Sequence, residues 1–165
     1  MAYRTRWFAT SFLLAWLLAN PARAQQTDRA AMPDSVFATT TASTLKWDPI
    51  QPPGFDKGAE LTVVRGDPSA AGKPYVIRLR FPDGYRFPPH WHPVAENLTV
   101  LEGQFLVAMG EKADESRLVT YRPGDFVFVA AKHPHFGGAR GQTAIQLHGV
   151  GPFDIVVVGS PQDKR

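Results

Sequence analysis

The stretch GYRFPPHWHPVAENLTVLEG, residues 84–103, places two histidines and a glutamate within seven positions of a segment that otherwise reads as apolar β-strand. His90 and His92 are separated by one residue, so both imidazoles lie on one face of an extended strand. If the extended geometry continues, Glu96 lies on that face as well. Two imidazoles and a carboxylate are a recurring ligand set for divalent iron and related metals. Solvated imidazoles beside prolines are the alternative interpretation.

The sequence around this stretch predicts an all-β fold. Segments rich in Pro, Gly and Asp have turn chemistry and separate the apolar runs. In residues 75–81, apolar side chains alternate with Arg78 and Arg80, which is the period of a half-buried strand with a solvated outer face. No segment after the N-terminal region shows a helical stripe, so we expect one sandwich or barrel. The predicted strands are 61–65, 75–81, 98–101, 105–109, 117–121, 126–129, 144–147 and 155–158.

The first 24 residues resemble a secretory signal peptide. Arg4 and Arg6 precede an apolar run, and Ala22-Arg23-Ala24 follows as an A-x-A cleavage site. The apolar run is shorter than the ~20 residues that a membrane-spanning helix needs, although a retained anchor is the alternative. We therefore expect an exported protein, periplasmic or secreted, that begins at Gln25.

Composition narrows the classes of function. Of the 18 basic residues, three lie in residues 1–24, so residues 25–165 carry 15 basic and 15 acidic residues and no net charge. This balance gives no indication of nucleic-acid binding or of a membrane surface after cleavage. The chain has no cysteine, which excludes thiol catalysis and thiolate metal sites. We expect a flexible arm at 25–44, a barrel at 45–160 and a tail at 161–165.

The spacing of the opening stretch resembles the first signature of the cupin superfamily. A second, partial match begins at Gly124-Asp125, continues through an apolar strand and places His135 at the position of the family's later histidine. The resemblance covers roughly residues 56–160. The second signature departs from the family pattern at three positions, where Pro, Gly and Asn are usual and this chain has Ala130, Lys132 and Ala139. The positions that match the first signature are Gly84, His90, His92, Glu96 and Gly103.

The resemblance implies a single cupin jelly-roll barrel with a metal site formed by His90, His92, Glu96 and His135. His133 and His135 are two residues apart and would lie on the same face of a strand, so strand alternation does not decide which of them binds the metal. His135 is the first choice because it lies at the distance from Gly124 that the family signature has for its histidine. We expect one divalent first-row metal ion. Manganese or iron is favoured, and zinc, nickel or copper remain open because nitrogen and oxygen ligands suit all of them.

Other polar and aromatic residues are candidates for the surroundings of the site. His148 and Gln146 either face the interior, beside the metal or a substrate, or simply end a strand. Aromatic side chains are expected to form either the wall of an apolar pocket or the ordinary barrel core. These aromatic residues are Tyr85, Phe87, Trp91, Phe105, Phe126, Phe128, Phe136 and Phe153.

These features favour an exported, metal-dependent enzyme, of dioxygenase or another oxidoreductase or isomerase type, that acts on a small organic molecule. A non-catalytic metal or small-molecule binding protein is the alternative, and a metal-free barrel for protein contacts is a third interpretation. The sequence identifies no catalytic residue and no organic cofactor. A homodimer paired through barrel edges is expected, with residues 45–47 as the candidate edge.

Overall fold

The computed structural model describes residues 37–164, and within them it consists almost entirely of β-strands. The two 3₁₀ turns η1 and η2 are the only helical elements in the described residues. In chain order the elements are η1 (Ala42–Thr44), β1 (Asp48–Ile50), β2 (Ala59–Arg65), β3 (Pro74–Phe81), β4 (Arg86–Trp91), β5 (Glu96–Met109), η2 (Glu115–Arg117), β6 (Val119–Tyr121), β7 (Phe126–Val129), β8 (His135–Val150) and β9 (Val156–Val157).

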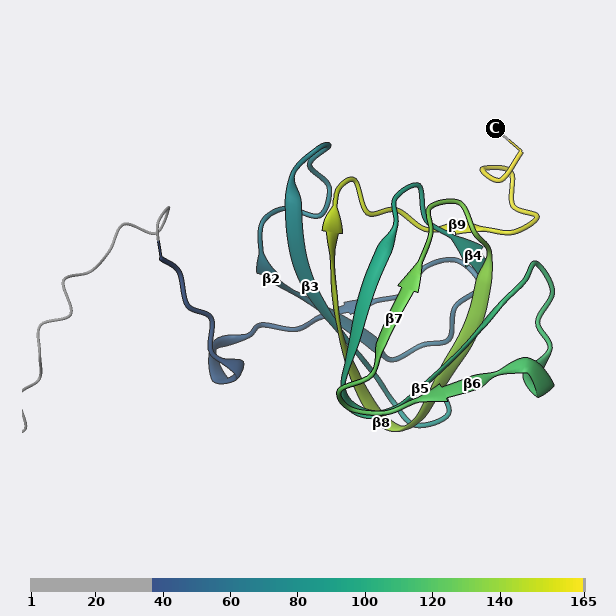
Figure 1. Ribbon diagram of the computed structural model, residues 1–165, viewed down its shortest axis with the longest axis horizontal. Coiled ribbons are helices and arrows are strands. Elements are labelled where there is room, and N and C mark those ends of the chain that lie inside the picture. Colours follow the sequence, from purple (N-terminus) through teal and green to yellow (C-terminus); the bar gives the residue numbers. More distant parts are fainter. Residues whose placement is uncertain (1–36, 165) are drawn as a thin grey trace, which may run out of the picture. The chain divides into compact units, whose positions relative to one another are not determined.

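The strands form one antiparallel sheet that curls on itself, because the long strands β5 and β8 belong to both of its halves (Figure 1). The C-terminal half of β8 pairs with β3 and with the beginning of β5. Its N-terminal half pairs with β4 and with the end of β5. Strands β1, β2 and β7 extend the first half, and β6 and β9 extend the second. The predicted all-β barrel is confirmed.

Each predicted strand overlaps an observed strand, but some boundaries were wrong. The predicted strands 98–101 and 105–109 are parts of the single strand β5, and the predicted strand 117–121 begins only at Val119, after η2. Strand β1 was not predicted, and β4 was predicted only around His90, without its beginning at Arg86. Strand β4 contains Pro88 and Pro89, and prolines argue against a strand because they cannot donate to the ladder.

The bend of β5 depends on Gly103. This residue has a φ of 72°, in the left-handed region that favours glycine. A Cβ atom at this position would lie 2.1 Å from the carbonyl oxygen of Gln142 and 2.4 Å from Oγ1 of Thr143. The pairing with β8 shifts register twice here, between Val100 and Glu102 and between Glu102 and Gln104. What the sequence presents as a turn is therefore a bend within one strand, pressed against β8.

Strand β3 shows the predicted alternation. Its four inward residues, Tyr75, Ile77, Leu79 and Phe81, are at most 9% exposed and belong to the hydrophobic core. On the outer face, Nε–H of Arg78 donates to Oε1 of Gln146 at 3.0 Å. The guanidinium of Arg80 lies 4.4 Å from the ring centre of Trp47 and pairs with Glu60. The arginines therefore lie on the face opposite the core, as expected.

The predicted signal peptide and residues 25–36 lie outside the described residues. The described part of the expected arm, residues 37–44, is exposed. The expected tail is not free, because Oδ1 of Asp163 accepts a hydrogen bond from the indole N–H of Trp91 at 2.7 Å. No helix within residues 37–164 has the length and apolar character needed to span a membrane. Residues 45–47 directly precede β1, which pairs only with β2 among the described strands.

Candidate metal centre

Three histidines from two distant parts of the chain converge inside the barrel. His90, His92 and His135 are each 4% exposed, and one nitrogen from each ring lies within 4.8 Å of the others. The ring centroids of His90 and His135 are 4.3 Å apart, and those of His90 and His92 are 4.9 Å apart. Three buried imidazoles this close together could hold one metal ion.

A bulge in β4 directs His90 inward. Phe87 pairs with Gly137 and His90 pairs with His135, so three steps along β4 match two steps along β8. The extra residue falls at Pro88-Pro89, where no N–H is available for the ladder. Strict alternation from the buried Phe87 would have turned His90 outward, but the bulge restores the inward direction. His90 and, two residues later, His92 therefore both face the interior.

Glu96 lies beside the histidines, as expected, but not because the chain stays extended between His92 and Glu96. The chain does not remain extended after His92, because a bend at residues 93–94 separates it from Glu96, which is the first residue of β5. Glu96 is 5% exposed. Its Oε1 lies 3.2 Å from Nε2 of His92, and its Oε2 lies 3.3 Å from Nε2 of His135. One carboxylate thus lies within hydrogen-bonding distance of two of the imidazoles.

Backbone carbonyls orient all three rings. The Nδ1 atom of His90 is 2.8 Å from the carbonyl oxygen of Pro88, and that of His92 is 2.6 Å from the carbonyl oxygen of Asp154. The Nδ1 atom of His135 is 3.2 Å from the carbonyl oxygen of His133. A carbonyl oxygen only accepts, so Nδ1 carries the proton in each neutral ring. The lone pair of each Nε2 is thereby left for the interior of the cluster.

Burial favours the neutral form of His90 and His92. Desolvation, assisted by the neighbouring histidines, lowers the pKa of His90 to about 2. Desolvation also lowers the pKa of His92, against the opposing influence of the Glu96 charge. For Glu96, burial acts to raise the pKa, but the close contact with His135 and the proximity of His92 outweigh it and lower the pKa. A neutral imidazole and an ionised carboxylate are the forms that bind metal.

The cluster fits a divalent metal ion. It supplies three imidazole nitrogens and a carboxylate in a buried position, and the second nitrogen of each imidazole is held by a carbonyl, as is usual for metal-binding histidines. Four such donors without sulfur suit first-row metals, and they leave positions free on a six-coordinate ion.

The cluster opens onto a cavity of about 210 Å³ inside the barrel. Apart from the four cluster residues, Tyr85 is the only described residue lining this cavity with a polar side chain. Burial, reinforced by the charge of Asp56, raises the pKa of Tyr85 to about 12, so its phenol stays protonated at neutral pH. The cavity is therefore an apolar chamber with one strongly polar wall.

The partly exposed residues of the cavity wall mark its mouth. They come from two segments, one leading from β1 into β2 and the other following β8, whereas the rest of the wall is buried. In the second segment, the ring of Phe153 stacks on His92 with centroids 4.7 Å apart. In the first, the ring of Phe55 meets His90 edge-on at 4.9 Å. The residues concerned are Ile50, Pro52, Phe55, Leu61, Phe153 and Ile155.

The structure separates His135 from the other sequence candidates. His133 is exposed in the turn before β8, and its Nδ1 bonds to the carbonyl of Ala131 rather than entering the cluster. Of the two interpretations left open for His148 and Gln146, the structure does not place their side chains in the interior. Leu147 between them points inward, so strand alternation turns both outward, where His148 is exposed.

Some of the aromatic candidates line the cavity, and others face outward. Tyr85, Phe87, Phe105 and Phe153 line the cavity. Phe126 and Phe128 instead project outward from β7 and are 54% and 60% exposed. Phe55 also lines the cavity but was not among the sequence candidates, because it lies outside every predicted strand. Trp91 and Phe136 are also absent from the cavity wall among the described residues.

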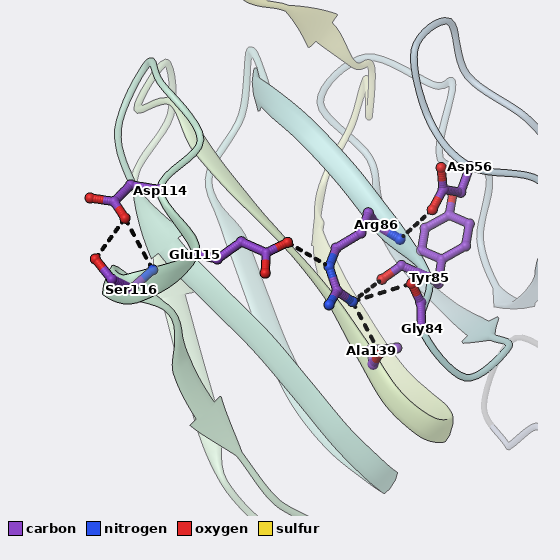
Figure 2. Close-up of polar contacts among 8 residues, drawn as sticks. All are labelled: Asp56, Gly84, Tyr85, Arg86, Asp114, Glu115, Ser116 and Ala139. Carbon is purple, nitrogen blue, oxygen red and sulfur yellow. Dashed lines mark hydrogen bonds and ion pairs between the residues drawn. The ribbon is translucent and has the colours of Figure 1, made fainter.

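A network around Arg86 anchors the first mouth segment to the barrel (Figure 2). The backbone N–H of Arg86 donates to Oδ2 of Asp56 at 2.8 Å, and the N–H of Asp56 donates to the carbonyl of Arg86 at 3.2 Å. The guanidinium of Arg86 donates to the carbonyl of Tyr85 at 3.1 Å and to Glu115 at 3.2 Å. The loop that carries Phe55 is thus fixed to the beginning of β4.

Comparisons with known proteins agree with this architecture. Residues 77–156 match the family model described as "Cupin domain". Among solved structures, the polyketide cyclase RemF from Streptomyces resistomycificus is 19% identical, with a TM-score of 0.62 over 77% of this chain and 89% of that chain. A cupin 2 conserved barrel domain protein from Rhodopseudomonas palustris is 15% identical, with a TM-score of 0.57 over 76% and 87%. KdgF from Halomonas sp. is 19% identical, with a TM-score of 0.52 over 68% and 92%.

The comparison with curated proteins found no match. At these identities the structural likeness shows the fold alone. The family match, the curled antiparallel sheet and the three converging histidines nevertheless agree with one another. Residues 77–156 therefore form a cupin domain, and the fold of the chain is a single cupin jelly roll.

Proposed function

We propose that the protein is an exported, metal-dependent cupin enzyme that acts on a small organic molecule. The observation that carries this proposal is the buried set of His90, His92, His135 and Glu96 facing an apolar cavity. A site with only a structural role has no need of a ligand-sized chamber beside it. The chamber gives a substrate access to the positions that the four protein ligands leave free.

The chain's own residues have definite roles in this proposal. The Nε2 atoms of the three histidines and the carboxylate of Glu96 would hold one divalent ion, which would supply Lewis-acid or redox chemistry to a bound oxygen atom. The charge of Glu96 would offset part of the charge of the ion. The apolar wall would exclude water from the bound substrate.

The metal in this proposal is manganese or iron, with zinc, nickel or copper as alternatives. The donor set is compatible with each of these, and affinity order alone does not decide among them. Elemental analysis of protein purified from the exported fraction tests the proposal. We expect close to one first-row metal ion per chain, and metal-free protein from that fraction would contradict it.

A non-catalytic metal or small-molecule binding protein is the second candidate, and a specific observation favours it. Among the described residues that line the cavity, none besides the cluster itself and Tyr85 can exchange a proton. Chemistry there would have to rely on the metal centre and one phenol. Screening for oxygen uptake and for turnover of small organic molecules by the metal-loaded protein separates the two candidates, since a binding protein would give neither.

Export is part of the proposal and is supported by the N-terminal sequence. The charged start, the short apolar run and the Ala22-Arg23-Ala24 site predict cleavage after Ala24. The intact mass of the protein recovered from the periplasm or the medium tests this. A mass that begins at Gln25 is expected, whereas a mass that includes residues 1–24 would indicate a retained anchor.

A further inference from the structure

We infer that the ligand of this site is an apolar, ring-sized molecule with one oxygen-bearing edge, held at the mouth of the cavity between Phe55 and Phe153. The inference rests on the proposed metal site and adds to it the chemical class of the ligand and two residues that select it. Three features lead to it: the distribution of polar atoms in the cavity, its size, and the contacts of the two phenylalanines.

The distribution of polar atoms excludes ligands that are polar all round. No Lys, Arg, Asn or Gln side chain lines the cavity among the described residues, and Tyr85 is the only polar side chain outside the cluster. A sugar, or an acid with several charges, would lose water from its polar groups and find few partners here, which disfavours binding. The oxygen atoms of a well-matched ligand therefore gather at one edge, which faces Glu96 and the histidines.

The size of the cavity limits the rest of the ligand. Its volume of about 210 Å³ exceeds the ~150 Å³ of an apolar protein cavity known to hold benzene. One substituted ring fits this space, and larger polycyclic molecules do not unless they extend through the mouth.

Phe153 connects the mouth to one of the proposed metal ligands. Its ring lies nearly parallel to the imidazole of His92, at an interplanar angle of 15°. The carbonyl of the next residue, Asp154, holds Nδ1 of His92 at 2.6 Å. The backbone N–H of Phe153 donates to the carbonyl of Pro68 at 2.7 Å, which fixes the segment. A ring bound beside His92 would therefore meet a preformed aromatic surface.

Phe55 has the corresponding place beside His90. Its ring meets the imidazole of His90 at 64° and stacks on Phe87 with centroids 6.1 Å apart. The hydrogen bond from the backbone N–H of Arg86 to the Asp56 carboxylate (Figure 2) holds its loop in position, together with the bond from the N–H of Asp56 to the carbonyl of Arg86. Both phenylalanines are partly exposed, so each has surface free for a ligand. Offset or edge-on contacts with such rings favour a flat, apolar ligand.

Calorimetric titration of the manganese-loaded protein, under argon to prevent oxidation, tests the inference. The probes are catechol, a ring with two adjacent oxygens, and D-galacturonate, a ring of comparable size with polar groups all round. Each titration uses the wild type, Phe55→Leu, Phe153→Leu and the control Phe128→Leu. Leucine keeps an apolar side chain at each site and removes the aromatic face, and Phe128 lies on the outer surface. Elemental analysis accompanies every sample.

Catechol should bind the wild type at least tenfold more tightly than galacturonate. Phe55→Leu and Phe153→Leu should each weaken catechol binding by about three- to tenfold with the metal retained, and Phe128→Leu should leave it unchanged. Wild-type protein that holds no manganese would overturn the metal site and this inference together. Metal-loaded protein that prefers galacturonate, or that binds catechol equally in all four variants, would overturn the inference and leave the metal site intact.

Discussion

His90 and His135 lie directly opposite each other across the β4–β8 pair, with their ring centroids 4.3 Å apart. The two residues come from the two separate signatures of the sequence, and only the fold of the barrel brings them together. A metal ion held by both would tie β4 to β8, and it would tie both strands to β5 through Glu96. Binding would then stabilise the folded chain by mass action, by about 2.7 kcal/mol at a free metal concentration 100 times the Kd.

Removal of one proposed ligand should empty the site. We expect His92→Ala and His135→Ala each to weaken metal binding by about 100-fold or more, since changes to residues that merely support a ligand already cost 10- to 100-fold. The metal-dependent rise in Tm should disappear with the metal. Elemental analysis and thermal unfolding with and without added manganese measure both effects.

His133→Ala is the matched control, because His133 lies two residues from His135 but bonds to the carbonyl of Ala131 outside the cluster. This variant should keep the metal and the stabilisation. Loss of metal from His133→Ala, together with retention in His135→Ala, would mean that the wrong histidine has been assigned to the second signature.

The metal-free protein should lose stability as the pH falls below neutrality. The folded pKa values of His90 and His92 lie below the ordinary value of ~6.5, so below that pH the unfolded chain takes up protons that the folded chain does not. Each such histidine removes about 1.4 kcal/mol per pH unit while its folded form stays neutral. Glu96, with a lowered folded pKa, adds a loss only below about pH 4.5. Urea unfolding between pH 7 and pH 5 measures the slope.

His90→Gln should make this slope shallower by about 1.4 kcal/mol per pH unit, because it removes one titrating imidazole and keeps a polar side chain of similar reach. A midpoint that does not change with pH in the wild type would contradict the buried, neutral state of His90 and His92.

The alternation of apolar and polar residues predicted the strands better than it predicted the positions of the residues in the candidate metal centre. The alternation in β3 depends only on its own residues, so Tyr75 and Ile77 fell on the correct face. The inward direction of His90 depends on a bulge that two prolines force on β4, and the position of Glu96 depends on a bend at residues 93–94. The sequence prediction placed His90, His92 and Glu96 on one face of a continuous extended strand, and the structure has no such strand.

The sequence could not assign His148 and Gln146 to a face of the sheet for a related reason. Strand alternation predicts that His148 and Gln146 lie on the same face of the strand, but it does not say which face is buried. Only the burial of Leu147 and Ile145 in the structure shows that their face is the inner one. Phe55 was missed because it lies in a segment without strand periodicity. Its place at the mouth depends on the hydrogen bonds between its neighbour Asp56 and Arg86, which are 30 positions apart. Contacts between distant segments of this kind leave no local pattern.

The two glycines of the first signature should respond differently to alanine. Both have positive φ values, 77° at Gly84 and 72° at Gly103, so either substitution incurs about 1 kcal/mol of backbone strain. A Cβ at Gly84 would meet no atom within 4 Å, whereas at Gly103 it would lie 2.1 Å from a backbone oxygen. Gly84→Ala should therefore cost about 1 kcal/mol, and Gly103→Ala more than about 3 kcal/mol, in the free energy of unfolding. Urea denaturation compares them, and equal costs would contradict the close approach of β5 and β8.

Lys132 occupies a position where the cupin signature usually has glycine, and its backbone conformation in the structure is one that favours glycine. Lys132 has a φ of 61° and is the only described residue other than glycine with a positive φ. Its backbone N–H donates to the carbonyl of His92 at 2.8 Å, so this turn supports a residue of the candidate metal centre. A side chain in the left-handed region costs roughly 1–2 kcal/mol, which glycine avoids.

Lys132→Gly should therefore stabilise the metal-free protein by about 0.5–1 kcal/mol, the relief of strain being partly offset by the greater freedom of glycine in the unfolded chain. Lys132→Val should destabilise it, because β-branched residues tolerate a positive φ least. Lys132→Ala is the control, since it removes the charge but keeps the Cβ atom, and it should lie within about 0.5 kcal/mol of the wild type. In urea denaturation, we expect Lys132→Gly to be the most stable variant, the wild type and Lys132→Ala to be intermediate, and Lys132→Val to be the least stable. If Lys132→Ala raised stability as much as Lys132→Gly, the lysine charge and not the backbone conformation would be the source of the strain.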